Sequence, residues 1–130
     1  MDSDFSIDID HPSGALATVR GQLDIATAPA LRDALLSLIN EGATDLVVDL
    51  EGVSFVDSTG LGVLVSATKR VQSKGGSMTV ICTRPQTLKV LKITGLESIF
   101  AVRDTLPAAL RIDATDPIEP GGLMTGRDES

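Results

Sequence analysis

The run Asp57-Ser58-Thr59-Gly60-Leu61-Gly62 holds a carboxylate, two hydroxyls and two glycines within six residues. It follows an apolar segment typical of a β-strand and precedes a pattern with helical spacing, so we expect it at the N-terminus of a helix. Free N–H groups and the positive end of the helix dipole favour an anion at such a position. A hydroxyl there can cap the helix, or it can accept a phosphate.

Serine catalysis at this run is not supported by the rest of the chain. A serine nucleophile requires a base, and the only histidine, His11, lies in a polar turn near the N-terminus. The first glycine of a nucleophile elbow is missing before Ser58, and Val65 stands where a dinucleotide fingerprint needs a third glycine. We therefore predict no catalytic residue and no cofactor.

Three carboxylates could in principle bind magnesium, because Asp24, Asp49 and Asp57 all lie near the ends of predicted elements. Helix caps and solvated loop acids are the favoured interpretation, and we predict no metal site. The single cysteine, Cys82, lies in a predicted strand, where a buried thiol is favoured over a redox role.

Composition limits the possible partners. The net charge is −7 and the sequence contains neither Trp nor Tyr, which argues against a nucleic acid or an anionic membrane as partner. The lone cysteine cannot form an internal disulfide, and the acidic N-terminus is not followed by the apolar segment of a signal peptide. We predict a cytoplasmic protein with a single folded domain.

Hydrophobic periodicity predicts alternating strands and helices. Strands are expected at 5–9, 16–21, 46–50 and 78–82, with a loop through 21–26, another through 51–52, and a short edge strand at 99–102. Helices are expected from Thr27, capped by its own hydroxyl with Pro29 in the first turn, from Ser58, after a capping box at 83–86, and at 105–111. This order predicts an α/β fold, with helices packed on a mixed sheet of four to five strands.

The last residues lose this periodicity. Pro117, Pro120 and several glycines and acids follow residue 112. We therefore predict one folded domain at 1–112 and a disordered acidic tail at 113–130.

Two interpretations of the helix start remain open on the residues alone. The favoured one is a Ser/Thr cap, with glycines that allow the strand and helix to pack. The other is a phosphorylation switch, in which a phosphate adds about −1.5 to −2 charges to a docking surface. In that case Gly60 and Gly62 would keep the helix start low, so that a partner's backbone can approach.

Two blocks of sequence resemble a known family. The run 46–64, with its complete Asp-Ser-Thr-Gly-Leu motif, closely resembles the signature of the STAS-domain anti-sigma factor antagonists, and 21–31 resembles the family's second block. The order of elements from 5 to 111 also agrees with that family. The resemblance implies a single STAS-like domain and reverses the preference for a simple cap.

The resemblance also implies a mode of action. In that family, the unphosphorylated antagonist binds an anti-sigma factor that is also a serine kinase, and the sigma factor is released. The kinase phosphorylates the serine of the motif, here Ser58, with Thr59 as the alternative acceptor, and a PP2C-type phosphatase reverses the modification. The alternative, also found among STAS domains, is an unmodified scaffold subunit of a signalling or transport complex.

The resemblance assigns a partner-binding face to this chain. It comprises the motif and the loop expected beside it: Asp24, Ile25, Thr27, Asp57, Ser58, Thr59, Gly60 and Leu61. Asp57 is expected to position the hydroxyl or to contact the kinase. We expect a monomer or a weak dimer. A small-nucleotide binder or hydrolase acting at the same face is the remaining hypothesis.

Overall fold

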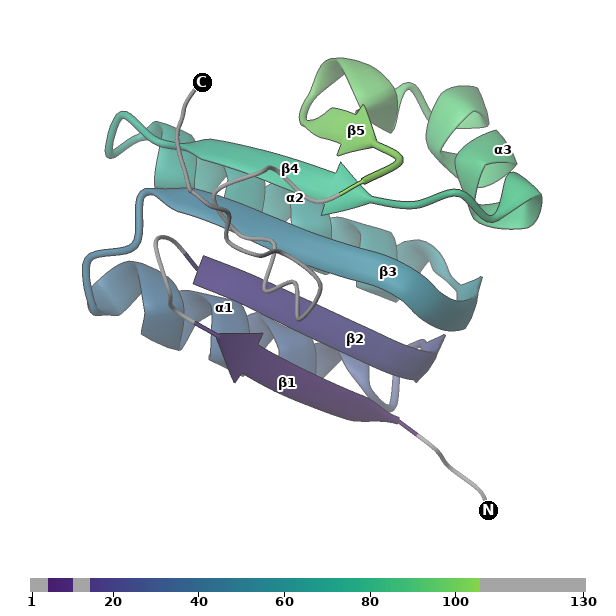
Figure 1. The fold of residues 1–130 in the computed structure, drawn as a ribbon, viewed down its shortest axis with the longest axis horizontal. Coiled ribbons are helices and arrows are strands. Elements are labelled where there is room, and N and C mark those ends of the chain that lie inside the picture. Colours follow the sequence, from purple (N-terminus) through teal and green to yellow (C-terminus); the bar gives the residue numbers. More distant parts are fainter. Residues whose placement is uncertain (1–4, 11–14, 106–130) are drawn as a thin grey trace, which may run out of the picture.

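Five strands form one mixed sheet, and they lie in the sheet in the order in which they occur along the chain (Figure 1). The computed structural model describes residues 5–10 and 15–105. The elements are β1 (Ser6–Asp10), β2 (Ala15–Leu23), α1 (Ala28–Asn40), β3 (Asp45–Val56), α2 (Ser58–Gln72), β4 (Ser77–Ile81), α3 (Pro85–Ile93), the 3-10 turn η1 (Leu96–Ser98) and β5 (Ala101–Arg103). The predicted α/β fold with a mixed sheet is confirmed.

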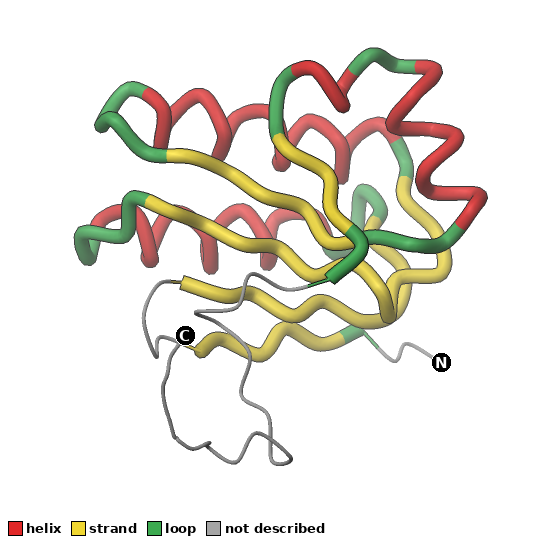
Figure 2. The backbone as a smooth tube through the Cα atoms, turned by 45° about the horizontal axis from the view of Figure 1, so that its top comes forward, coloured by secondary structure: helices red, strands yellow, loops and turns green. Residues whose placement is uncertain are grey.

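The parallel direction of β2 and β3 brings the connections that follow these two strands together. β1 and β2 are antiparallel, whereas β2, β3, β4 and β5 run parallel to one another. Leu23 at the end of β2 pairs with Val56 at the end of β3, so both strands finish at the same edge of the sheet (Figure 2). The β2–α1 loop and the β3–α2 junction therefore lie side by side, although Leu23 and Val56 are 33 positions apart in the sequence.

The core lies between the sheet and the helices α1 and α2, which cover one face of it (Figure 1). Side chains alternate across a strand, so Leu46, Val48 and Leu50 of β3 face these helices and are almost completely buried. Val47 points to the opposite face and is also buried, beside Leu16 and Ile81. Both faces of β3 therefore carry buried side chains.

Two strands are longer than the sequence pattern indicated. The predicted loops at 21–23 and 51–52 are wrong, because β2 and β3 continue to pair as far as Leu23 and Val56. The ladder changes register between Thr18 and Arg20 and again between Gly21 and Gln22. These irregularities accommodate Gly21, which has a positive φ of 98°, without ending the strand.

The predicted capping box at the start of α3 is wrong. The N-cap is Arg84, and no side chain forms a capping hydrogen bond there. The Thr83 hydroxyl instead donates to Glu51 Oε1 at 2.6 Å, and the backbone N–H of Thr83 donates to the same carboxylate. A side chain from β3 therefore holds the start of α3, and local sequence carries no signal for that contact.

The other predicted element boundaries either agree with the structure to within a few residues or fall outside the described residues. Pro29 lies in the first turn of α1, and the edge strand appears as β5, slightly later than predicted. The predicted turn at 11–14, which contains His11, the helix at 105–111 beyond Thr105, and the tail at 113–130 lie outside the described residues.

Replacing Leu64 in the core should be costly. Leu64 of α2 has no exposed surface, so Leu64→Ala should lower the free energy of unfolding by about 2–5 kcal/mol through lost burial and a residual cavity. Urea unfolding followed by far-UV circular dichroism measures this loss. Ser66→Ala, an exposed position on the same helix, is the control and should change stability by less than about 0.5 kcal/mol. Equal midpoints for both variants would contradict this packing.

Candidate functional site

The N-cap of α2 is Asp57, and not either of the hydroxyl residues that follow it. Asp57 has an extended backbone, and its Oδ1 accepts a hydrogen bond from Gly60 N at 3.0 Å. The interpretation of Ser58 or Thr59 as the helix cap is therefore wrong. Ser58 is the first residue of the helix, and both hydroxyl residues are exposed. Among the described residues, neither hydroxyl forms a hydrogen bond with another protein group.

The other oxygen of Asp57 holds the neighbouring loop. Asp57 Oδ2 accepts a hydrogen bond from Ile25 N at 3.1 Å, and Asp57 N donates to Leu23 O at 3.1 Å. One residue thus joins the start of α2 to the β2–α1 loop. The structure places the loop and the hydroxyl motif together, as the resemblance implied.

The loop has its own internal support from Asp24. Asp24 Oδ1 accepts hydrogen bonds from Ala26 N at 3.0 Å and from Thr27 N at 3.1 Å. The Thr27 hydroxyl donates to Gln22 O at 2.7 Å and accepts from Asp24 N at 2.9 Å. The predicted capping of α1 by the Thr27 side chain is therefore wrong, since that hydroxyl faces back into the loop. The loop presents Ile25, which is 73% exposed.

The predicted site residues differ in exposure. Ile25, Ser58 and Thr59 are exposed, whereas Asp24, Thr27 and Asp57 are half-buried. Gly60 and Leu61 are buried, so they support the surface from beneath. A Cβ on Gly60 would lie 2.6 Å from Leu23 Cγ, which shows that this glycine allows α2 to pack on β2. Gly62 is exposed, and a Cβ there would have no atom within 4 Å.

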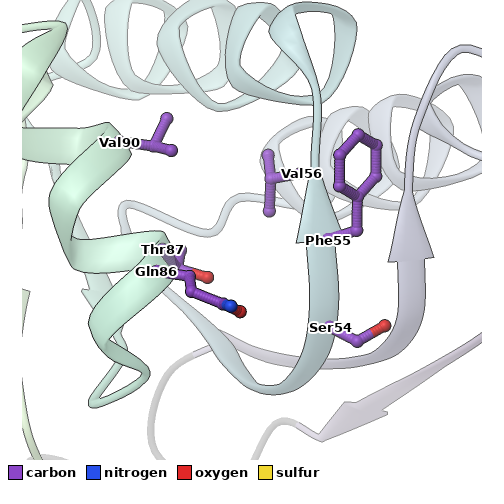
Figure 3. Close-up of a pocket in the computed structure, with 6 residues that line it drawn as sticks. All are labelled: Ser54, Phe55, Val56, Gln86, Thr87 and Val90. Atoms are coloured by element: carbon purple, nitrogen blue, oxygen red, sulfur yellow. The ribbon is translucent and has the colours of Figure 1, made fainter.

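A groove beside the β2–α1 loop and the start of α2 was not predicted from the sequence. It has a volume of about 330 Å³ and lies between the end of β3 and α3; Figure 3 shows its lining residues, Ser54, Phe55, Val56, Gln86, Thr87 and Val90. Val56 and Val90 come from opposite walls, and Phe55 is 50% exposed. Half of the lining belongs to α3, whose position depends on tertiary contacts, so no local signal could have shown the groove.

The three carboxylates considered for magnesium serve the backbone. Asp24 and Asp57 accept the N–H groups described above, and Asp49 Oδ1 accepts from Glu51 N at 2.9 Å. Within residues 5–10 and 15–105, no group of three His, Cys, Asp or Glu side chains is arranged to hold a metal ion. The favoured interpretation agrees with Asp57 as a helix cap and Asp24 as a loop acid. For Asp49 it is wrong, because this residue lies within β3 and not at the end of an element.

The described part of the chain contains no helix long and apolar enough to span a membrane.

The fold and the motif together define a class of protein. The sequence profile of the STAS domain family matches residues 6–109, which is most of the chain. The chain therefore belongs to the STAS domain family, as its resemblance implied.

Known relatives narrow this class. The anti-sigma-B factor antagonist of Bacillus subtilis strain 168 is 39% identical over 84 residues, which cover 65% of this chain and 76% of that protein. The anti-sigma-B factor antagonist of Staphylococcus aureus strain NCTC 8325 is 33% identical over 86 residues, covering 66% and 80%. A crystal structure of an anti-sigma factor antagonist from Mycobacterium paratuberculosis has a TM-score of 0.74 at 30% identity, covering 82% and 92%. Each of these relatives is named as an antagonist, and the chain belongs to the family that contains them.

Two glycines in the first turns of α2 should respond oppositely to alanine. Gly60→Ala forces a methyl group against Leu23 and should destabilise the fold by about 1–3 kcal/mol. Gly62→Ala meets open space and should stabilise it by about 0.5–1 kcal/mol, because alanine has the higher helix propensity. Urea midpoints compare the two variants directly. Shifts of the same sign would show that α2 does not pack on Leu23 as described.

The thiol of Cys82 should be inert in the native state. Cys82 is 2% exposed, and burial raises the pKa of its thiol, so little thiolate forms at neutral pH. We expect iodoacetamide to modify the folded chain at least about a hundredfold more slowly than the urea-unfolded chain. Intact mass measured over time gives both rates. Comparable rates would mean that the thiol is accessible and would reopen a redox role.

Proposed function

We propose that this chain is an anti-sigma factor antagonist switched by phosphorylation of Ser58. In its unphosphorylated form it binds an anti-sigma factor serine kinase, and the sigma factor is released. Phosphorylation of Ser58 ends the interaction, and a PP2C-type phosphatase restores it. The observation that carries this proposal is the division of roles at the start of α2: Asp57 caps the helix, and the exposed Ser58 hydroxyl is left for modification.

The fold should tolerate a phosphate at Ser58. Asp57 would keep the cap whether or not the neighbouring hydroxyl is modified, because its hydrogen bonds do not involve Ser58. The added charge also lies at the positive end of the α2 dipole, which offsets part of its repulsion from the Asp57 carboxylate. The modification therefore acts on the surface rather than on the stability of the domain.

The surroundings of Ser58 explain how a phosphate would prevent docking. The exposed Ile25 of the β2–α1 loop and Phe55 near the end of β3 provide apolar contact area, and Asp24 and Asp57 are nearby acids. A phosphate adds about −1.5 to −2 charges here, and a partner that covers it must desolvate it and approach an already acidic surface. An uncompensated charge at an interface costs several kcal/mol, or a loss of affinity by powers of ten.

The proposed docking face combines the predicted residues with the unpredicted groove. Asp24, Ile25, Thr27, Ser58 and Thr59 lie on the loop and the helix start. The groove beside Val56 extends this surface to α3, where it offers space for an apolar side chain of the kinase. Asp57, Gly60 and Leu61 hold the two parts in position from below.

The first test identifies the modified residue. The purified chain is incubated with the candidate anti-sigma factor kinase from the same organism and ATP, and its intact mass is measured. We expect the mass of one phosphate to be added to the wild-type chain and to Thr59→Ala, the matched control, and none to Ser58→Ala. Phosphate on Ser58→Ala, but not on Thr59→Ala, would move the acceptor to Thr59.

The second test measures the switch itself. Ser58→Ala should bind the kinase with the affinity of the unmodified chain even in the presence of ATP. Ser58→Glu should bind at least about a hundredfold more weakly, because it places a charge within the interface. Circular dichroism shows whether both variants are folded. Equal affinity for both variants, or recovery of a multi-subunit complex without a kinase, would favour the unmodified scaffold instead.

A further inference from the structure

A second groove lies on the outer surface of the two long helices. It has a volume of about 250 Å³ and is lined by Arg32 and Leu36 of α1 and by Val63, Ser66, Ala67 and Arg70 of α2. Leu36, Val63 and Ala67 provide apolar walls, whereas the two arginines and Ser66 are exposed. The groove is thus an apolar surface flanked by two guanidinium groups, one from each helix.

Helix stability does not account for the arginine on α1. Arg32 is the fifth residue of α1 and lies outside the last turn, so the helix dipole gives its charge no stabilisation. Its ion pair with the adjacent Asp33 has a distance of 3.4 Å, and the two side chains are 56% and 73% exposed, so the pair contributes little. Arg70 is in the last turn of α2, which suits the dipole, but it forms no ion pair with any residue of the described chain. Both guanidiniums therefore have hydrogen-bonding capacity to offer a partner.

We propose that this groove binds an acidic amphipathic helix of a partner protein. An apolar side chain of that helix packs against Leu36, Val63 and Ala67, and carboxylates one turn away on either side pair with Arg32 and Arg70. Charge complementarity supports this occupant, because the groove carries two cations on a chain whose net charge is −7. The proposal does not depend on phosphorylation of Ser58.

Charge also disfavours the other possible occupants. A second copy docked through the same groove would bring four guanidinium groups together, two from each chain. An anionic membrane surface would attract the two arginines but repel the excess of acidic residues over the rest of the chain. A short acidic helix can bind in the groove without covering the acidic residues elsewhere on the chain.

A synthetic peptide pair tests the proposal on the full-length chain. The probe is an acetylated helical peptide of about 18 residues with leucines at i and i+4 and glutamates flanking them. Its matched control carries lysine at every glutamate position. In nitrogen–proton correlation spectra of the chain, the glutamate peptide should shift the backbone amide signals of Leu36, Val63, Ser66 and Ala67. The lysine peptide should leave these signals unchanged. Silent groove residues, shifts centred on Asp24 and Ser58, or equal binding of the lysine peptide would overturn the proposal.

Charge reversal then assigns the affinity to the arginines. The double variant Arg32→Glu/Arg70→Glu should weaken binding of the fluorescently labelled glutamate peptide by about tenfold or more, as measured by anisotropy. Lys92→Glu, an exposed cation on α3, is the control and should change the dissociation constant by less than about twofold. The folded state of each variant is checked by its urea midpoint. Unchanged affinity in the double variant would overturn the proposal.

Two further measurements distinguish the competing occupants. Co-sedimentation with phosphatidylglycerol vesicles that is lost in Arg32→Glu/Arg70→Glu would replace the peptide helix with a lipid surface and overturn the proposal. A dimer that appears in light scattering and disappears in the same double variant would replace it with a second copy. Under the proposal, the chain neither sediments with these vesicles nor changes its oligomeric state with the substitutions.

Discussion

The candidate site depends on two hydrogen bonds that the carboxylate of Asp57 accepts. One oxygen accepts the N–H of Gly60 and starts α2, and the other accepts the N–H of Ile25 and fixes the β2–α1 loop. Two segments that are distant in sequence are therefore positioned by one side chain. Because the cap is an acid that belongs to the last residue before the helix, the serine after it can remain on the surface without a structural role.

Under the proposed function, this arrangement would separate folding from regulation. A serine that caps a helix contributes about 1 kcal/mol to stability, and modifying it would place that contribution at risk. Here the capping hydrogen bond to Gly60 belongs to Asp57, and the tight contact between Gly60 and Leu23 holds the helix on the sheet. A charge added to Ser58 would then change what the surface can bind while leaving these interactions in place.

The elements that could be predicted are those determined by local periodicity. The apolar stripes of α1 and α2 and the β-branched run in β3 specify their own burial, so the α/β order and the position of Ser58 at a helix start follow from the sequence. The caps do not follow in this way. Thr27 and Thr83 have the right side chains for caps, but Gln22, Asp24 and Glu51 bind their hydroxyls instead. The groove at Val56 depends on α3 in the same manner, since Glu51 fixes the start of that helix from another strand.

For binding a short partner segment, the local distribution of charge matters more than the net charge of the chain. A net charge of −7 argues against a polyanion, which would need a broad basic surface. The net charge does not exclude an acidic partner at the two arginines that flank an apolar groove. A short bound segment interacts mainly with charges that lie within about one Debye length of that segment, roughly 8–10 Å. α2 contributes to both surfaces: its first residues stand beside Asp24 and Asp57, and its outer side carries Arg70. Under the two proposals, the start of α2 would therefore lie in an acidic surface and its outer side in a basic groove, and the two surfaces would favour partners of different charge.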